Sequence, residues 1–159
     1  MANEYPFVAF RFDVRLLVDN ARELGLTNPL CDAAFAECDG LEMTMEPKVV
    51  KEGGNNLQQL HLVGAVTYGN LTLKRGMTPN LDLWKWFAGV AGKAGKGAKA
   101  SAVVRLLDPG SKPESEKVNV RFLLTGCLPI KLKAPALHAK DGMVAIEEMQ
   151  IAYTAFTVE

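Results

Sequence analysis

The chain has 159 residues, of which 48% are apolar and 23% are charged, proportions typical of a folded globular protein rather than a disordered one. Its 18 basic and 18 acidic residues balance, which excludes a net field that would draw the whole molecule onto nucleic acid or an anionic membrane. We expect one domain spanning residues 1–159, long enough to bury roughly 70% of its unfolded surface.

Apolar runs in the sequence are short. Residues 16–18 and 122–124 fall far short of the roughly 20 residues that cross a bilayer. The start, MANEYPFVAF, lacks the basic flank and long apolar stretch of a secretion signal. Cys31, Cys38 and Cys127 form neither a CxxC pair nor a paired framework, so reduced thiols are expected. The sequence therefore predicts a cytoplasmic protein without a membrane-spanning segment.

Residues 10–18 alternate with period two, which is typical of a half-buried strand. We expect one face to pack in a core, formed by Phe10, Phe12, Val14, Leu16 and Val18. The other face is nearly all charged. Its polar members, Arg11, Asp13 and Arg15, are predicted to meet water or a neighbouring subunit.

Glycine, asparagine and proline interrupt the pattern that follows. Residues 19–32 predict a loop because turn-favouring residues recur in them. A strand from residue 33 to residue 46 is expected to be kinked or bulged, with a break at Gly40. Residues 52–56, EGGNN, favour positive φ and defeat a continuous ladder, so we expect a mobile loop or a long hairpin there.

Further strands are predicted at residues 66–74, 102–108, 117–128 and 143–158, the first with a register shift at Gly69 and Asn70. Asp108, Pro109 and Gly110 predict a turn. About seven strands with hairpin-length connections and no βαβ rhythm favour a mainly β fold. We expect an antiparallel β-sandwich or barrel with one packed α-helix.

That helix follows the strand at residues 66–74. Thr78 or Asn80 can cap it, Pro79 suits an early helical position, and Asp82 favours the positive helix start. An apolar stripe at three- and four-residue spacing is predicted to cover the sheet, with Lys85 left exposed. The stripe consists of Leu81, Trp84, Phe87, Ala88 and Ala91, and the core helix residues expected are Leu81, Trp84 and Phe87.

A glycine- and lysine-rich segment, GVAGKAGKGAKA at residues 89–100, predicts a flexible loop that ends the helix. Its spacing is not that of a P-loop, because Val90 stands five residues before Gly95 and Gly97 follows Lys96. Residues 85–105 hold five basic and no acidic residues, which predicts a positive patch. A solvated loop or a protein contact is favoured over nucleic acid because no aromatic residue interleaves the loop.

No pattern in the sequence indicates catalysis or metal binding. His61 and His138 belong to no HExxH, GxSxG or Cys-His signature and are expected to be surface or loop histidines. Glu147 and Glu148 are adjacent on a predicted strand, so their carboxylates point to opposite faces and cannot act as an acid/base pair. We expect no cofactor.

Four segments become informative through their order and spacing. Residues 10–46 contain FRFDVRLLVDN and then AAFAECDGLEMTME; residues 51–87 contain KEGGNN, LTLKRGMT and a Trp-containing helix. Residues 103–111 are VVRLLDPGS, and residues 128–153 are LPIKLKAPALHAKDGMVAIEEMQIAY. Together they cover nearly the whole chain and resemble the tail tube family of contractile phages and phage-derived contractile injection systems.

The resemblance implies a fold related to the secreted ring proteins of type VI systems. It implies a homo-oligomer of hexameric rings stacked into an inner tube, with a sheath around it, baseplate and tail terminator proteins at its ends, and cargo protein or DNA in the lumen. Two contacts are expected in such a tube. Subunit-contact candidates are Glu52, Gly53, Gly54, Asn55 and Asn56, and sheath-contact candidates are Lys93, Lys96 and Lys99.

Alternatives remain open at this point. A baseplate-proximal tube initiator would share the same sequence pattern as the main tube subunit. A monomeric β-barrel could bind a small ligand in its mouth, although few strands carry apolar residues on both faces. The basic region at residues 85–105 could instead bind nucleic acid. An enzyme is the remotest alternative.

Overall fold

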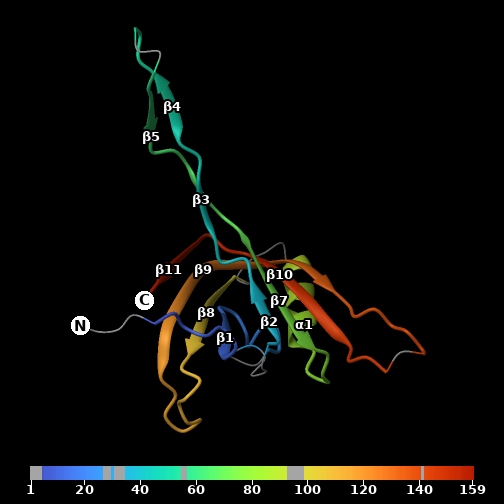
Figure 1. The fold of residues 1–159 in the computed structure, drawn as a ribbon. Coiled ribbons are helices and arrows are strands. Elements are labelled where there is room, and N and C mark those ends of the chain that lie inside the picture. Colours follow the sequence, from blue (N-terminus) through green and yellow to red (C-terminus); the bar gives the residue numbers. More distant parts are fainter. Residues whose placement is uncertain (1–4, 27–29, 31–34, 55–56, 93–98, 141) are drawn as a thin grey trace.

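The computed structural model describes residues 5–26, 30, 35–54, 57–92, 99–140 and 142–159 (Figure 1). Within them the chain forms eleven strands and one helix. In chain order these are β1 (Phe12–Val18), β2 (Glu37–Asp39), β3 (Met43–Met45), β4 (Lys48–Lys51), β5 (Gln59–Leu62), β6 (Val66–Tyr68), β7 (Asn70–Gly76), α1 (Asp82–Gly92), β8 (Ala100–Leu107), β9 (Val118–Lys133), β10 (Ile146–Ala152) and β11 (Ala155–Val158).

Seven strands form one strongly curved antiparallel sheet in the order β1-β8-β9-β10-β7-β2, with β11 paired to β9. The 16-residue strand β9 belongs to both halves of this sheet, because β8 and β11 pair with its first part and β10 with its second. The mainly β, antiparallel, sandwich-like fold with one helix is confirmed. Among the described strands no pairing joins β1 to β2, so the sheet does not close into a barrel.

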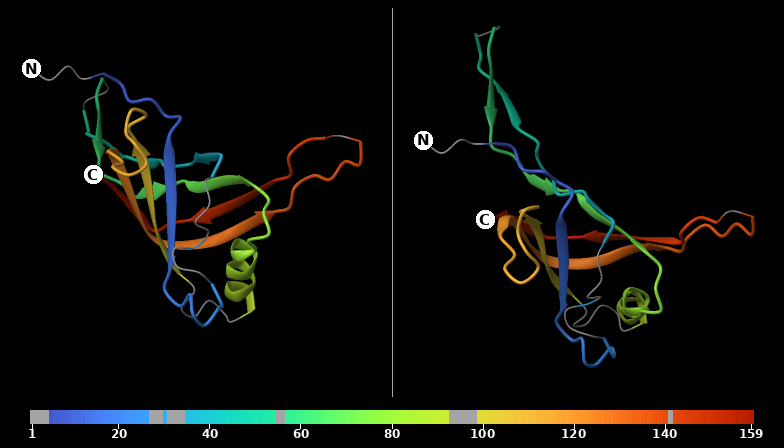
Figure 2. Two further views of the ribbon diagram at one scale, coloured as in Figure 1. Left: turned by 90° about the horizontal axis from the view of Figure 1, so that it is seen from below. Right: turned by 60° about the horizontal axis from the view of Figure 1, so that its bottom comes forward.

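Alternation along the strands places the core on one face of the sheet. Val14, Leu16 and Val18 of β1 are buried there with apolar residues of β7, β8, β9 and β10. Helix α1 and the segment after β1 lie on this same side of the sheet (Figure 2). The expectation for β1 is wrong at Phe10, which precedes the strand and is 71% exposed. Phe10 lies beyond the pairing of β1 with β8, which begins at Phe12 opposite Leu106.

The predicted interruptions are confirmed. Gly40 separates β2 from β3 at φ +98°, and a Cβ atom there would lie 1.9 Å from the carbonyl oxygen of Asn70. Only glycine tolerates both the left-handed backbone and this close approach. Gly69 separates β6 from β7 at the predicted register shift. Glu52, Gly53 and Gly54 follow β4, which pairs with β5, so the long-hairpin expectation is correct, and Asn55 and Asn56 lie outside the described residues.

Helix α1 buries a different stripe from the predicted one. Leu83 and Trp86 are fully buried, whereas Trp84 and Phe87 are half-buried. Leu81 lies before the first helical turn and is 44% exposed, so its assignment to the core helix was wrong. Asn80 caps the helix, because its side-chain oxygen accepts a hydrogen bond of 2.9 Å from the backbone N–H of Asp82. The helix therefore begins at Asp82, one residue after Leu81, the first residue of the predicted stripe. Lys85 is exposed, as expected.

Two predicted strand boundaries also need correction. Strand β9 continues past residue 128 through Pro129 to Lys133, because β10 pairs along this part and a register shift between Gln150 and Ile151 accommodates the proline. The predicted strand at residues 143–158 is divided into β10 and β11. The helix extends to Gly92, beyond the residue at which the glycine-rich loop was expected to end it.

Candidate functional site

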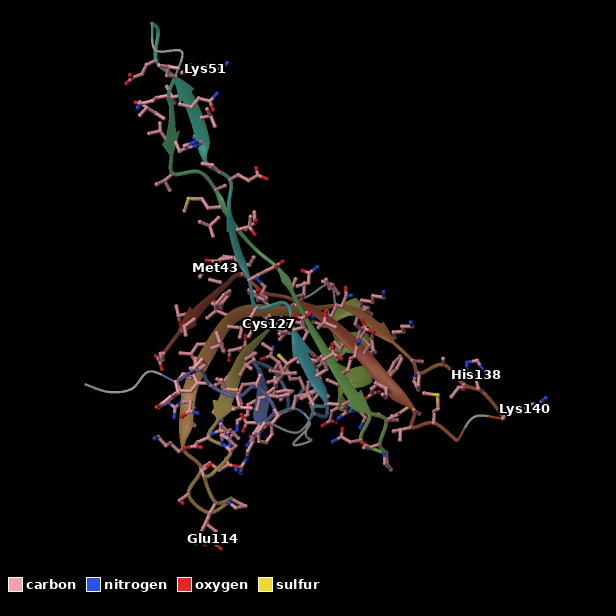
Figure 3. The ribbon with its side chains drawn as sticks, in the orientation of Figure 1. Met43, Lys51, Glu114, Cys127, His138 and Lys140 are labelled. Carbon is pink, nitrogen blue, oxygen red and sulfur yellow. The ribbon has the colours of Figure 1, made fainter. Side chains whose placement is uncertain are left out.

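The most prominent surface feature is a two-stranded projection that we call the arm, residues 43–68 apart from residues 55 and 56, which lie outside the described part. Strand β3 pairs with β6 near the sheet, and β4 pairs with β5 further out. Figures 1 and 3 show the arm extending away from the sheet, with Met43 near its base and Lys51 near its tip. Every residue of β3, β4 and β5 is exposed.

One face of each arm ladder is apolar. In the outer ladder Val50 pairs with Leu60. Lys48 and Leu62, each two residues further along its strand, pair on the same face. The opposite face carries Val49, Lys51, Gln59 and His61. In the inner ladder Met45 pairs with Val66 and Met43 with Tyr68, whereas Thr44 and Thr67 occupy the other face. The arm is therefore amphipathic, and its outer ladder is exposed along its whole length.

The base of the arm is held by an aromatic cluster. The hydroxyl of Tyr153 donates a 2.8 Å hydrogen bond to the carbonyl of Gly40 and accepts one of 3.2 Å from the N–H of Glu42. Burial raises the pKa of Tyr153, which keeps the hydroxyl protonated and able to donate. Tyr68 packs against Tyr153 and Phe156, with 5.8 Å between ring centroids in each case. The arm therefore leaves the sheet from a firmly attached base.

A second apolar projection is the loop between β9 and β10, which we call the apolar loop, residues 134–140 and 142–145. Figure 3 shows it extending beyond the sheet, with His138 and Lys140 toward its end. Leu137, Met143 and Val144 are 85%, 82% and 76% exposed. The two limbs of the loop and Ile146 enclose a groove of about 710 Å³. A hydrogen bond of 2.8 Å from the N–H of Met77 to the carbonyl of Ala145 fixes the return limb to the end of β7.

The face of the sheet opposite the core, which we call the open face, is charged. One row crosses four strands with alternating signs: Lys133, Glu148, Lys74 and Glu37. Lys74 and Glu37 are 3.4 Å apart. In the other half Arg105 forms a bidentate pair with Asp13, and this hydrogen bonding raises the pKa of Arg105. The predicted polar face of β1 is thus confirmed for Asp13 and Arg15.

The two edge strands of the sheet differ in charge on the open face. At the β1 edge Arg15 is exposed, while Asp13 is occupied by Arg105. At the β2 edge Glu37 and Asp39 are both exposed and acidic. Unpaired backbone groups on edge strands are templates for pairing with another chain. Here Arg15 on β1, 3.9 Å from Asp13, and Glu37 on β2, 3.4 Å from Lys74, are exposed side chains of opposite charge.

A buried ion pair fixes the approach to α1, and it was not foreseen from the sequence. Arg75 Nε donates to Glu147 Oε1 with both side chains 1% exposed. Trp84 Nε1 donates to Glu147 Oε2 at 2.9 Å, and Arg75 Nη2 donates to the carbonyl of Asn80 at 2.7 Å. The sequence signal was weak, because Glu147 lies in the predicted strand at residues 143–158 whereas Arg75 lies one residue beyond the predicted strand at residues 66–74. Glu147 and Glu148 point to opposite faces, as expected.

The predicted contact residues fall in different places. Glu52, Gly53 and Gly54 are exposed at the arm's outer turn, whereas Asn55 and Asn56 lie outside the described residues. Lys93 and Lys96 also lie outside them. Lys99 is exposed, and its carbonyl accepts a 3.0 Å hydrogen bond from the N–H of Asp19. Arg105 is on the open face and Lys85 on the helix at the other side of the sheet, so these two do not share one positive patch.

The described residues contain no group of three or more His, Cys, Asp and Glu side chains that could hold a metal ion. Burial raises the pKa of Cys38 to about 12 and that of Cys127 to about 11, which keeps both thiols protonated. His61 and His138 are exposed. The helix of the described part is too short and too polar to cross a membrane.

Comparison with known families decides the relationship. The family model described as T4-like virus tail tube protein gp19 matches residues 8–157. The chain belongs to this tail tube family. A search of curated proteins gave no match.

Solved structures of contractile systems share this tail tube fold. A chain of the anti-feeding prophage baseplate is 26% identical, with a TM-score of 0.80 and coverage of 99% of this chain and 97% of that one. A chain of an extracellular contractile injection system, the PVC sheath-tube complex in its extended state, is 17% identical with a TM-score of 0.76, covering 98% and 93%. A type six secretion system protein is 10% identical with a TM-score of 0.53, covering 93% and 83%.

Proposed function

We propose that this tail tube protein is a structural, non-catalytic subunit that assembles into hexameric rings, and that these rings stack into the inner tube of a contractile phage tail or injection system. The observation that carries the proposal is the arm, whose outer ladder has no buried residue. An isolated two-stranded hairpin is marginally stable in water. An arm that is apolar on one face needs a partner surface, and membership of the tail tube family supports another subunit as that partner.

Ring closure would proceed through the edges of the sheet. The β1 edge, which Leu30 bridges at Leu16, carries Arg15, and the β2 edge carries Glu37 and Asp39. Pairing the β1 edge of one copy with the β2 edge of the next would remove the exposed edges and continue the open face around a channel. That charged, water-compatible face would line the conduit for cargo protein or DNA, with α1 outside.

The remaining contacts follow from this orientation. The arm's turn at Glu52, Gly53 and Gly54, together with Asn55 and Asn56, would contact a neighbouring subunit, because its glycines let two backbones approach closely. The segment with Lys93, Lys96 and Lys99 follows α1 and would meet the sheath. Baseplate and terminator proteins would contact the end rings. The chain, proposed to act as a single domain, would be made and assembled in the cytoplasm.

The purified protein tests the proposal through its oligomeric state. Light scattering and electron microscopy over rising concentration should show six-fold rings and then rods with a central channel. The matched variant is Val50→Glu with Leu62→Glu, which changes two exposed arm residues and no core residue. It should retain the β-sheet spectrum yet remain monomeric. A native chain that stays monomeric at every concentration, and is absent from tubes in particles, contradicts the proposal.

One observation favours a different place for this subunit in the same particle, next to the baseplate. The similarity to the anti-feeding prophage baseplate chain is 26% identity, against 17% for the PVC sheath-tube chain. This supports a baseplate-proximal tube initiator as the alternative. The number of copies in purified particles distinguishes the two roles. A main tube subunit should be as abundant as the sheath protein, whereas an initiator should be present only in the number of copies that form one ring.

A further inference from the structure

We infer that the groove of the apolar loop receives the apolar face of the arm of a second copy of this chain. The inference rests on the proposed tube assembly and names the two surfaces that would join. The arm supplies Val50, Leu60 and Leu62, and the groove supplies Leu137, Met143 and Val144. Neither surface is occupied in the described part of the chain.

The arm contributes one apolar face rather than a scatter of apolar residues. Val50, Leu60 and Leu62 stand on one side of the outer ladder and are 41%, 45% and 52% exposed. Lys48, the partner of Leu62, shares that side, and Val49, Lys51, Gln59 and His61 stand on the other side. A strand pair that alternates in this way normally has its apolar face against a partner and its polar face in water. The arm is therefore built to dock by one face.

The apolar loop contributes a concave partner of the same chemistry. Its groove, about 710 Å³, is walled by alanine, proline and aliphatic side chains, with His138 as the titratable member of the lining. This size lies within the ~300–1,000 Å³ range of pockets that enclose a ligand of several side chains' volume. Leu137, Met143 and Val144 are strongly exposed, and all three line this groove. Exposed apolar residues that lie together mark a binding surface, whereas scattered single ones do not.

The occupant must come from another molecule. The arm and the apolar loop project from the sheet in different directions in all views, so one copy cannot insert its own arm into its own groove (Figures 1 and 2). The two surfaces differ, so the contact is head-to-tail, and a head-to-tail contact repeats from copy to copy until a ring closes or a filament grows. That is the mode of assembly a tube requires, and the chain itself supplies both halves of the contact.

Cysteine cross-linking between copies tests the pairing directly. In a Cys31→Ser background, a Leu60→Cys copy is mixed with a Val144→Cys copy and oxidised mildly. A disulfide-linked heterodimer should form, and far less of it when Ser115→Cys, an exposed position in the β8–β9 loop, replaces Val144→Cys. Cys38 and Cys127 contribute little background because burial raises the pKa of both thiols. Equal cross-linking of Leu60→Cys to both positions overturns the inference.

Charge substitution gives an independent measurement. Val144→Asp should raise the concentration needed for assembly at least about tenfold, because a carboxylate would be buried against the apolar arm. Val144→Asp combined with Leu60→Lys should recover a large part of that loss. Assembly of Val144→Asp at the same concentration as the unsubstituted chain contradicts arm docking. The inference is also wrong if the groove is covered by a small ligand or by sheath protein alone, without a second copy of this chain. If the unsubstituted chain forms no rings, the proposed function fails instead, so the two failures are distinguishable.

Discussion

At the scale of single residues, the buried pair of Arg75 and Glu147 carries the largest energetic consequence. Both side chains are 1% exposed, and among the described atoms Nη1 of Arg75 has no hydrogen-bond partner. Removing one member of a buried pair leaves an uncompensated charge, which is more costly than replacing both members by apolar residues. The pair also ties β7, β10 and the start of α1 together.

We predict that Glu147→Gln lowers the free energy of unfolding by about 3–5 kcal/mol, measured by urea denaturation. Glu148→Gln, on the open face of the same strand, should change it by no more than about 0.5 kcal/mol. The double variant Arg75→Met with Glu147→Leu should be more stable than Glu147→Gln alone. Equal effects of the two glutamine substitutions would show that the buried pair is not what stabilises this region.

The thiols give a second prediction at this scale. Because burial raises the pKa of Cys38 to about 12 and that of Cys127 to about 11 from an ordinary value of 9.0, both should resist alkylation at pH 8 in the folded chain and react after denaturation. The protonated thiols favour the folded state fully below pH 9. This contribution should decline as pH rises from 9 toward 11–12. Peptide mapping by mass spectrometry separates these sites from Cys31, and rapid labelling of Cys127 in folded protein would be inconsistent with its burial.

At the scale of secondary-structure elements, α1 shows that a long-range contact helps to select the buried face of a helix. The helix has aromatic residues on more than one side, at Trp84, Trp86 and Phe87. Asn80 caps the backbone at Asp82, and the contact of Trp84 with Glu147 holds Trp84 at the edge of the core. Trp86 and Leu83 then point into it.

We predict that Trp86→Ala lowers the free energy of unfolding by about 3–5 kcal/mol, because a fully buried aromatic side chain leaves a cavity. Leu81→Ala, at a 44% exposed position outside the helix, should change it by no more than about 0.5 kcal/mol. Thermal denaturation followed by circular dichroism measures both. The reverse ranking would restore the face predicted from spacing alone.

The arm is the element on which assembly depends in the proposed function, and a glycine at its midpoint tests it. A Cβ atom at Gly64 would lie 1.7 Å from the carbonyl oxygen of Glu46 on the other strand, whereas at Gly53 it would meet no described atom within 4 Å. We predict that Gly64→Ala distorts the arm between its two ladders and weakens assembly at least several-fold, with little change in the unfolding temperature of the sheet. Gly53→Ala should assemble normally. Gly54 is unsuitable as a control because its φ of +88° strains any other residue.

At the scale of the whole molecule, the proposed ring joins the β1 edge of one copy to the β2 edge of the next. We predict that Arg15→Glu weakens ring formation and makes it less sensitive to salt, since it places like charges beside Glu37 and Asp39 of the next subunit. Arg15→Glu combined with Glu37→Lys should recover ring formation. Native mass spectrometry over a salt series measures both variants. Unaltered rings from Arg15→Glu would show that these two edges do not meet.

Much of the fold was predictable from local pattern. Period-two alternation identified β1 and the core positions Val14, Leu16 and Val18, because adjacent side chains on a strand must point to opposite faces. Glycine identified the breaks at Gly40 and Gly69, and at Gly40 only a residue without a Cβ atom fits the left-handed backbone beside Asn70. Four ordered segments also indicated the tail tube family, which the family model confirms over residues 8–157.

Only the tertiary structure decided which patterned surfaces are covered. Periodicity divides an element into faces but does not state which face finds a partner, so α1 turned Trp86 rather than Leu81 into the core. Glu147 is buried because Arg75, 72 residues away, meets it across a strand pairing. The arm has an ordinary strand-like sequence, and its exposure arises because β3–β6 continue beyond the sheet that contains β2 and β7. Burial is a property of long-range neighbours, and a local sequence pattern contains no information about them.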